Sequence, residues 1–359
     1  MKPVYLYLQN GREIAGRGFG ARRPAKGKLV FTTALTGYAE SLTDPSFCGQ
    51  ILVFTNPLIG NYGFENHRME SGRVQASAVV VSELSRGHSN PRARRSLHAA
   101  LARYGVPGIE GVDTRTLTVC LREEGCQNGI LSFVRLSKSE RTRRMASVPD
   151  MEGLDLSERV TSRKSLWHLP KGKCGLAVAL LDYGVKRNII REFLNLGVAV
   201  RQWPAGTTAG EILASRPAGL ILSNGPGDPA AMRGAVEQIR VLIGQIPIFG
   251  ICLGHQLLGL AAGLSTYKLK FGHRGTNHPV VDLRNRRVAI TTQNHGFSVR
   301  VSRGNRRVRI THLSLYDETV EGLEIPGRRA FGVQYHPEST PGPHDSIHLF
   351  NRFLETCRG

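Results

Sequence analysis

The second half of the chain alternates short apolar runs with segments of helical spacing. Apolar runs of strand length occupy 175–181, 198–203 and 218–222. Between them, residues 186–196 and 208–215 repeat their apolar positions with the period of a helix. Strands that alternate with helices in this way predict an α/β fold, with a mostly parallel sheet and helices on both of its faces.

A further strand and helix meet at a cysteine. The apolar run 246–251 leads directly into Cys252, and the apolar residues that follow suit a buried helix. Gly250 and Gly254 flank the cysteine and allow a nucleophile elbow, the sharp turn at which a side chain stands clear of a strand end. A thiol at a helix N-terminus meets the positive end of the helix dipole, which favours the nucleophilic thiolate.

A histidine and a carboxylate that suit this cysteine follow 84 residues later. The strand-like run 331–335 leads into His336, and Glu338 comes two residues after it. A histidine can act as general base and then as acid to the leaving group, while a carboxylate orients it. A buried structural cysteine is the alternative, because free cysteines are among the most buried residues. The flanking glycines, Gln256 and the His336–Glu338 pair favour Cys252 as the nucleophile.

Two other segments are candidates for the same site. Residues 223–229 hold two glycines and two prolines after a strand, so they form either an ordinary turn or a stiff loop that a ligand approaches closely. Residues 293–297 are predicted as a polar loop after the strand-like 288–292, and a final helix is expected over 345–355. Sites in parallel sheets form beyond the carboxyl ends of strands, where these segments would meet.

Taken together, the spaced motifs of residues 174–359 resemble a class I glutamine amidotransferase domain. The resemblance implies a triad of Cys252, His336 and Glu338, in which the cysteine attacks the side-chain amide carbon of glutamine. His336 would protonate the departing ammonia, and water would release glutamate from the thioester. The backbone N–H of Leu253 and one from 225–227 would stabilise the oxyanion.

The sequence of the first half of the chain predicts only a β-rich domain with many turns, which by itself indicates no function. Several of its runs nevertheless resemble the N-terminal domain of the small-subunit family of carbamoyl-phosphate synthases, and two runs of the second half fit the same family. These runs are 31–40, 42–46, 56–63, 111–118 and 125–129, then 271–280 and 341–345. The resemblance covers essentially the whole chain.

The same resemblance assigns the substrate site. Eight residues are expected to contact L-glutamine: Ser46, Gly225, Gly227, Leu253, Gln256, Asn294, Gly296 and Phe297. Ser46 would come from the first domain, so the site is expected near the domain interface. We expect no metal site, because the spacing of His255, His273, His278 and His295 matches no compact zinc pattern.

Three parts are expected along the chain. Residues 1–140 would form the small-subunit N-terminal domain, 141–173 a linker rich in charged residues, Ser and Pro, and 174–359 the amidotransferase domain. Because the chain has no G-x-x-x-x-G-K-[ST] loop, we expect no cofactor in this chain. The resemblance implies a large subunit as partner, which would bind ATP, Mg and bicarbonate and make carbamoyl phosphate for arginine and pyrimidine biosynthesis.

Two other functions are open at this point. The chain could be the amidotransferase subunit of another pathway, such as aminodeoxychorismate or anthranilate synthesis, although those subunits typically lack such a first domain. A non-catalytic nucleic-acid-binding scaffold is the second alternative, and the intact Cys252, His336 and Glu338 disfavour it.

The net charge of +20 is spread over the chain. Residues 1–150 hold 21 basic and 12 acidic residues, for +9, and residues 151–359 hold 27 and 16, for +11. Arginine clusters occur, but no RNA- or DNA-binding motif accompanies them, so we expect no specific nucleic-acid partner. An arginine-biased proteome or an acidic partner surface is the simpler account of the charge.

The cysteines and the N-terminus bear on location. The six cysteines form no C-x-x-C pair, and a chain that needs a free thiolate suggests a reducing compartment, so we expect a cytoplasmic protein. The apolar start at 3–8 is too short for a signal peptide and leads through Asn10 and Gly11 into a predicted hairpin. No apolar run of about eighteen residues predicts a membrane span.

Overall fold

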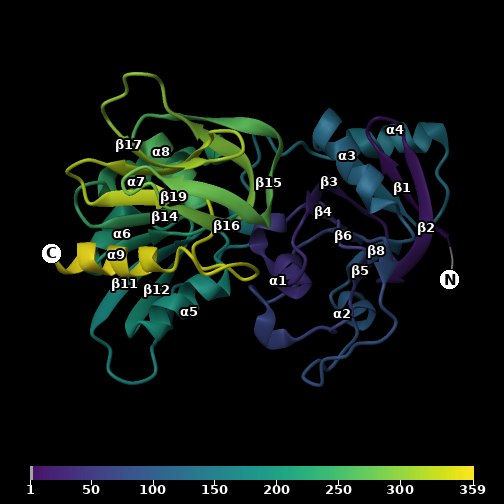
Figure 1. Ribbon diagram of the computed structural model, residues 1–359, viewed down its shortest axis with the longest axis horizontal. Helices are drawn as coiled ribbons and strands as arrows, with labels where there is room; N and C mark the ends of the chain where they lie inside the picture. Colours follow the sequence, from purple (N-terminus) through teal and green to yellow (C-terminus); the bar gives the residue numbers. More distant parts are fainter. Residues whose placement is uncertain (1–2) are drawn as a thin grey trace. The chain divides into compact units, whose positions relative to one another are not determined.

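The computed structural model describes residues 3–359, which form two compact units (Figure 1). The first unit ends at Met151 and the second begins at Glu152, so the division falls inside the segment expected as a linker. That segment is ordered rather than extended: α4 (Lys138–Ala146) packs with the first unit, and β10 (Leu166–His168) pairs with a strand of the second. A capping box between Ser137 and Glu140 explains why a charged stretch forms a helix here.

The first unit is built around a closed barrel, in the strand order β1-β2-β8-β6-β4-β3-β9. Its first two strands form the hairpin predicted at Asn10 and Gly11, and Gly11 supplies the positive φ of +89° in the turn. A β-rich first domain is thereby confirmed. The strands are β1 (Pro3–Leu8), β2 (Glu13–Gly20), β3 (Ala25–Thr32), β4 (Gln50–Phe54), β6 (Ala78–Val80), β8 (Pro107–Glu110) and β9 (Asn128–Ser132), with β5 (Leu58–Ile59) and β7 (Glu83–Leu84) in a separate small sheet. The helices are α1 (Tyr38–Thr43), α2 (Leu97–Arg103), α3 (Thr114–Glu124) and α4, with 3-10 turns η1 (Pro45–Phe47) and η2 (Asn66–Arg68).

The second unit contains one sheet, in the order β10-β12-β11-β13-β14-β19-β18-β16-β15-β17. From β12 to β19 neighbouring strands are parallel, as predicted, while β10 and the strands from β18 to β17 pair antiparallel. The strands are β11 (Leu176–Asp182), β12 (Val198–Pro204), β13 (Leu220–Leu222), β14 (Ile248–Ile251), β15 (Ser265–Asp282), β16 (Val288–Arg300), β17 (Arg309–Ser314), β18 (Val320–Ile325) and β19 (Ala330–Val333). The helices are α5 (Arg187–Asn195), α6 (Ala209–Ala214), α7 (Arg233–Leu242), α8 (Leu253–Ala261) and α9 (His348–Arg358), with 3-10 turns η3 (Ser157–Arg159) and η4 (Pro229–Ala231).

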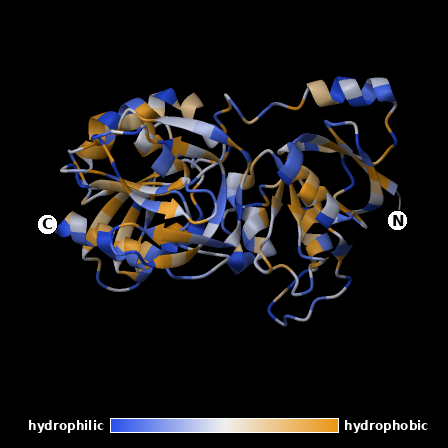
Figure 2. Cartoon of the chain, turned by 45° about the horizontal axis from the view of Figure 1, so that its top comes forward, coloured by the Kyte–Doolittle hydropathy of each residue, from blue (hydrophilic) through white to orange (hydrophobic). Residues whose placement is uncertain are grey.

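Alternate residues of β11 explain why helices cover both faces of this sheet. Val178 and Leu180 pack into the core with α5 and α9, whereas Ala179 and Leu181 pack into the core with α6, α7 and α8. A strand points successive side chains to opposite faces, so a continuous apolar run needs a cover on each side. In Figure 1, α7 and α8 lie above β14 and β19, whereas α5 and α9 lie below these two strands. Apolar residues are concentrated in these central strands (Figure 2).

Two sequence predictions of local structure are wrong. Residues 293–297 are not a loop, because they lie within β16, where Asn294 pairs with Arg274 of β15. Asn294 and Gln293 form hydrogen bonds with buried side chains, so this strand can be both polar and buried. Because its composition is that of a loop, the sequence alone suggested one. The last helix begins at His348 rather than at 345, and the carboxylate of Asp345 accepts a hydrogen bond from the N–H of Ile290 instead.

Within residues 3–359, no helix combines the length and the apolar character needed to cross a membrane. All six cysteines are free thiols in this structure.

Candidate active site

The candidate residues of the second unit gather where the parallel strands end. Cys252 follows β14, residues 223–228 follow β13, and His336 comes shortly after β19. The carboxyl ends of parallel strands lie along the same edge of a sheet, so these residues converge there as predicted.

Cys252 stands on a tight turn between β14 and α8. Its φ is +54°, a conformation that non-glycine residues rarely adopt and that is found at nucleophile elbows. The two flanking glycines make the turn possible. A Cβ on Gly250 would lie 2.7 Å from the carbonyl oxygen of Gly254, and a Cβ on Gly254 would lie 2.1 Å from that of Leu222. Only hydrogen fits at either position, so the elbow depends on both glycines.

His336 is oriented by Glu338. The Nδ1 atom of His336 lies 2.7 Å from Oε1 of Glu338, and both side chains are fully buried. This contact occupies one nitrogen of the ring. The other, Nε2, is buried without a hydrogen-bond partner among residues 3–359, and it remains available for the sulfur of Cys252.

Lys186 is a member of the site that our sequence reasoning missed. Its Nζ lies 2.9 Å from Oε1 of Glu338 and donates a second hydrogen bond, of 2.7 Å, to the carbonyl oxygen of Ser339. Asn188, in the first turn of α5, donates to the carbonyl oxygen of Glu338 at 2.6 Å. The sequence signal was present, since Lys186 follows β11 at the same sheet edge as Cys252, but we assigned it only to the start of a helix.

Electrostatics couple these side chains. Burial favours the neutral form of Glu338, but the charges of Lys186 and His336 outweigh it and lower the pKa of Glu338 to about 2. Burial also disfavours the imidazolium of His336, but the carboxylate of Glu338 and, to a smaller extent, the sulfur of Cys252 raise the pKa of His336 to about 10. The pair therefore resides as imidazolium and carboxylate, with a proton on His336 that can be donated.

A chain of amides reaches the sulfur from the other side. Gln334 points its Nε2 at Sγ of Cys252, at 3.7 Å, and its Oε1 accepts a 2.9 Å hydrogen bond from Gln256. Gln256 also donates to the carbonyl oxygen of Phe297, at 2.8 Å. Gln334 is a second residue that the sequence analysis missed, because it is a buried polar residue inside an otherwise apolar run.

The structure brings most of the predicted glutamine contacts together. A Cβ on Gly225 would come 2.9 Å from the side chain of Leu253, so the loop with Gly225 lies against the start of α8. Leu253 is the first residue of that helix, and its N–H therefore has no acceptor within the helix. On β16, the carbonyl oxygen of Asn294 is 3.8 Å from Sγ of Cys252. The predicted positions Gly227, Gly296 and Phe297 belong to these same two segments.

Ser46 lies in the first unit, within the 3-10 turn η1. It is buried there, and its N–H donates to the carboxylate of Asp44 at 2.9 Å. Its expected contact with glutamine stays a prediction, as do the contacts of the other seven residues.

Among the described residues, the group that could hold a metal ion is His273, His295 and Glu321, whose donor atoms lie within 4.8 Å of one another. Hydrogen bonds already engage the two histidines. Nε2 of His273 lies 2.8 Å from a carboxylate oxygen of Asp317, and Nδ1 of His295 lies 2.7 Å from the carbonyl oxygen of Phe297. The prediction that the chain has no metal site stays untested.

This network predicts a pH-dependent stability. Burial lowers the pKa of His273, but Asp317 and Glu321 outweigh it and raise that pKa from 6.5 to about 9, while neighbouring His278 and His295 are driven toward their neutral forms. The folded state binds this proton more tightly than the unfolded state. The stabilisation is therefore complete below pH 6.5 and is lost as the pH rises through about 9.

We expect His273→Asn to lose up to about 3 kcal/mol of unfolding free energy at pH 6 and much less at pH 9.5. Urea unfolding at a series of pH values measures this difference. If the unfolding free energies of the two proteins differed by the same amount at every pH from 6 to 9.5, the assignment of the proton to His273 would be excluded.

Comparison with known proteins gives two family matches. Residues 179–356 match glutamine amidotransferase class-I, and residues 6–131 match the carbamoyl-phosphate synthase small chain, CPSase domain. The chain is 47% identical over 356 residues to the carbamoyl phosphate synthase small chain of Chlorobaculum tepidum, covering 98% of this chain and 97% of that one. It is 45% identical over 368 residues to the one from Syntrophotalea carbinolica, covering 99% and 97%. Among solved structures, a glutamine amidotransferase from Thermotoga maritima covers 51% of this chain and 85% of its own, with 20% identity and a TM-score of 0.38.

Proposed function

The chain belongs to the family of carbamoyl phosphate synthase small chains, and from this premise we propose that it hydrolyses L-glutamine through Cys252, His336 and Glu338. The ammonia would pass to a separate large subunit that makes carbamoyl phosphate from bicarbonate and ATP. The membership confirms the resemblance stated from the sequence, including the class I amidotransferase domain in the second half of the chain.

The observation that carries this proposal is the buried His336–Glu338 pair beside a cysteine on a strained elbow. The sulfur of Cys252 would attack the amide carbon of the glutamine side chain and form a C–S bond. His336 would give its proton to the nitrogen as the C–N bond breaks, and ammonia would leave. A water molecule, deprotonated by His336, would then cleave the thioester and release glutamate.

Backbone N–H groups would stabilise the negative oxygen of each tetrahedral intermediate. The N–H of Leu253 supports this role, because it opens a helix and lies beside the loop with Gly225. Glutamine would be held by the eight residues expected from the sequence, with Ser46 contributed by the first unit.

The partner and the pathway complete the proposal. ATP and Mg would bind the large subunit, and the product would serve arginine and pyrimidine biosynthesis in the cytoplasm. The match of residues 6–131 to the small-chain domain favours this assignment over the amidotransferase subunits of other pathways.

Coupling to the large subunit tests the proposal. Alone, the chain is expected to release glutamate slowly, and a cognate large subunit with ATP and bicarbonate should raise the rate about tenfold or more, since coupling between sites typically spans 5–150-fold. Hydrolysis that is tied to the acceptor avoids the loss of free ammonia. The assay follows glutamate with and without the partner. A full rate in the isolated chain, unchanged by the partner, would indicate a free-standing glutaminase, and no hydrolysis in either case would refute the activity itself.

A further inference from the structure

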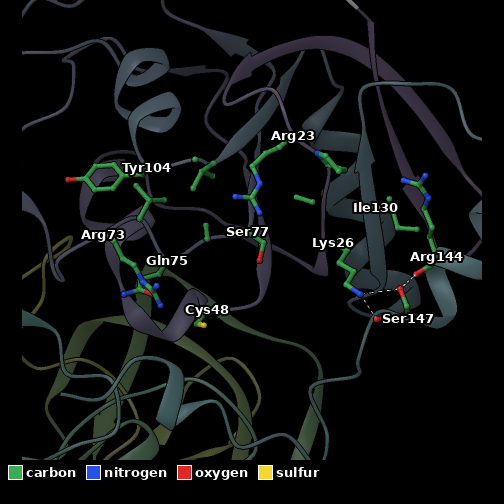
Figure 3. Close-up of a pocket in the computed structure, with 16 residues that line it drawn as sticks. Arg23, Lys26, Cys48, Arg73, Gln75, Ser77, Tyr104, Ile130, Arg144 and Ser147 are labelled. Atoms are coloured by element: carbon green, nitrogen blue, oxygen red, sulfur yellow. Dashed lines mark hydrogen bonds between the residues drawn. The ribbon is translucent and has the colours of Figure 1, made fainter. Parts of the chain in front are cut away.

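A cavity of about 650 Å³ opens in the first unit, and the mechanism proposed above makes no use of it (Figure 3). It is lined entirely by residues of that unit. They come from residues 23–26 at the start of β3, from Cys48, from the segments 73–77 and 104–106, from Ile130 of β9, and from Arg144 and Ser147 at the end of α4. Its volume falls in the range typical of small-molecule sites, about 300–1,000 Å³.

Four cationic side chains line this cavity: Arg23, Lys26, Arg73 and Arg144. They come from three separate segments of the chain, and among residues 3–359 no aspartate or glutamate lines the cavity. Figure 3 shows Arg23 reaching into the cavity toward Ser77. Like charges that converge in a concave surface produce a strong positive potential, which an anion relieves.

The ammonium group of Lys26 is oriented by neutral hydrogen-bond partners. Its Nζ donates to the carbonyl oxygen of Ser147 at 2.8 Å and lies 3.1 Å from Oγ of the same residue. Both partners are neutral, so they orient the ammonium group without cancelling its charge. Arg144 lies 3.8 Å from a carboxylate oxygen of Glu140 one turn earlier in α4, and such partly exposed pairs interact weakly.

The floor of the cavity differs from its rim. Val74, Val106 and Ile130 are buried apolar residues of the lining, whereas Arg23, Lys26 and Arg73 are exposed. A ligand that fits both parts carries an apolar body and anionic groups. Arginine pairs bidentately with phosphate and with carboxylate, so the lining suits either group.

We propose that this cavity binds a small organic anion with at least two negative charges, either a phosphate ester or a dicarboxylate. A nucleic-acid strand is a poorer fit, because such a strand needs a basic stripe along an extended surface, whereas these four cations line a single open cavity. The proposal does not depend on the glutaminase activity, since Cys252, His336 and Glu338 all belong to the second unit.

Calorimetric titration of the full chain tests the proposal, with pyrophosphate and succinate as probes at constant ionic strength. We expect saturable binding of at least one probe, and the tighter probe distinguishes phosphate from carboxylate recognition. Arg23→Gln combined with Lys26→Gln should weaken that binding at least about tenfold, the effect of losing one charge-assisted hydrogen bond or more. Arg23→Lys, which keeps the charge, should weaken it less.

The matched control is Arg303→Gln combined with Arg306→Gln, which removes the same charge from exposed positions of the second unit. This variant should bind the probes like the parent chain. If both double variants bound the probe equally weakly, the binding would be non-specific attraction to positive charge, and the proposal would be overturned. The absence of saturable binding for both probes would overturn it as well. If neither probe binds and the Arg23/Lys26 variant loses affinity for the large subunit, the cavity docks an acidic protein segment instead. Melting temperatures without probe establish that each variant is folded.

Discussion

The variant Cys252→Ser is expected to hydrolyse glutamine at least about 10³-fold more slowly than the parent chain, because a serine hydroxyl at this position lacks the nucleophilicity of a thiolate. The substitution changes one buried atom and leaves the elbow glycines in place, so the fold and the association with the large subunit should persist. Glutamate release from the complex measures the loss. With ammonia supplied in place of glutamine, the same complex should still make carbamoyl phosphate.

Cys174→Ser is the matched control, since Cys174 is an exposed free thiol. It should hydrolyse glutamine at the parental rate. A Cys252→Ser variant that hydrolysed glutamine normally would show that Cys252 is not the nucleophile. Loss of the ammonia-dependent reaction as well would indicate a damaged fold or a damaged complex, which the melting temperature resolves.

We expect His336→Asn to lose more glutaminase activity than Glu338→Gln, and Glu338→Gln to lose more stability than His336→Asn. His336→Asn removes the proton donor, so its glutaminase rate should fall almost as far as that of Cys252→Ser, because triad members act as a unit. Glu338→Gln keeps a hydrogen-bonding side chain beside His336, and its loss of rate should be smaller. It also breaks the buried ion pair between Lys186 and Glu338, and loss of one partner of such a pair typically costs about 3–5 kcal/mol.

Glutamate release and urea unfolding of the two variants measure these rankings. The double variant Glu338→Gln with Lys186→Met should recover much of the lost stability, because it removes both charges of the buried pair. A rate defect of Glu338→Gln larger than that of His336→Asn would reverse the roles assigned to the two residues. A Glu338→Gln chain as stable as the parent would contradict the importance of the Lys186 pair.

The nucleophile elbow could be predicted from the sequence because its cause is local. Gly250 and Gly254 lie two residues from Cys252 on either side, and the structure shows why no side chain fits at either position. The same is true of the alternation of strands and helices in the parallel part of the sheet, which follows from the period of the apolar residues. The His336–Glu338 contact was predictable too, since the two residues are close in sequence.

Lys186 and Gln334 could not be assigned in this way. Each acts across the sheet, Lys186 on Glu338 and Gln334 on the sulfur of Cys252, and such pairings depend on strand order rather than on sequence spacing. The mistaken loop at 293–297 has a related cause. Gln293 lies in the sheet because its amide reaches the buried carboxylate of Glu321, and composition alone cannot reveal that partner.

The attachment of β10 to the second unit bears on how this chain can be divided for experiments. Cutting at residue 174 would remove β10 and expose the backbone of β12, and an unpaired sheet edge is a template for aggregation. It would also remove the hydrogen bond from the N–H of Gly153 to Asp228, which borders the loop with Gly225 and Gly227. A fragment intended to carry the glutaminase residues should therefore begin at Glu152, and one that begins at 174 should be recovered mainly as insoluble protein.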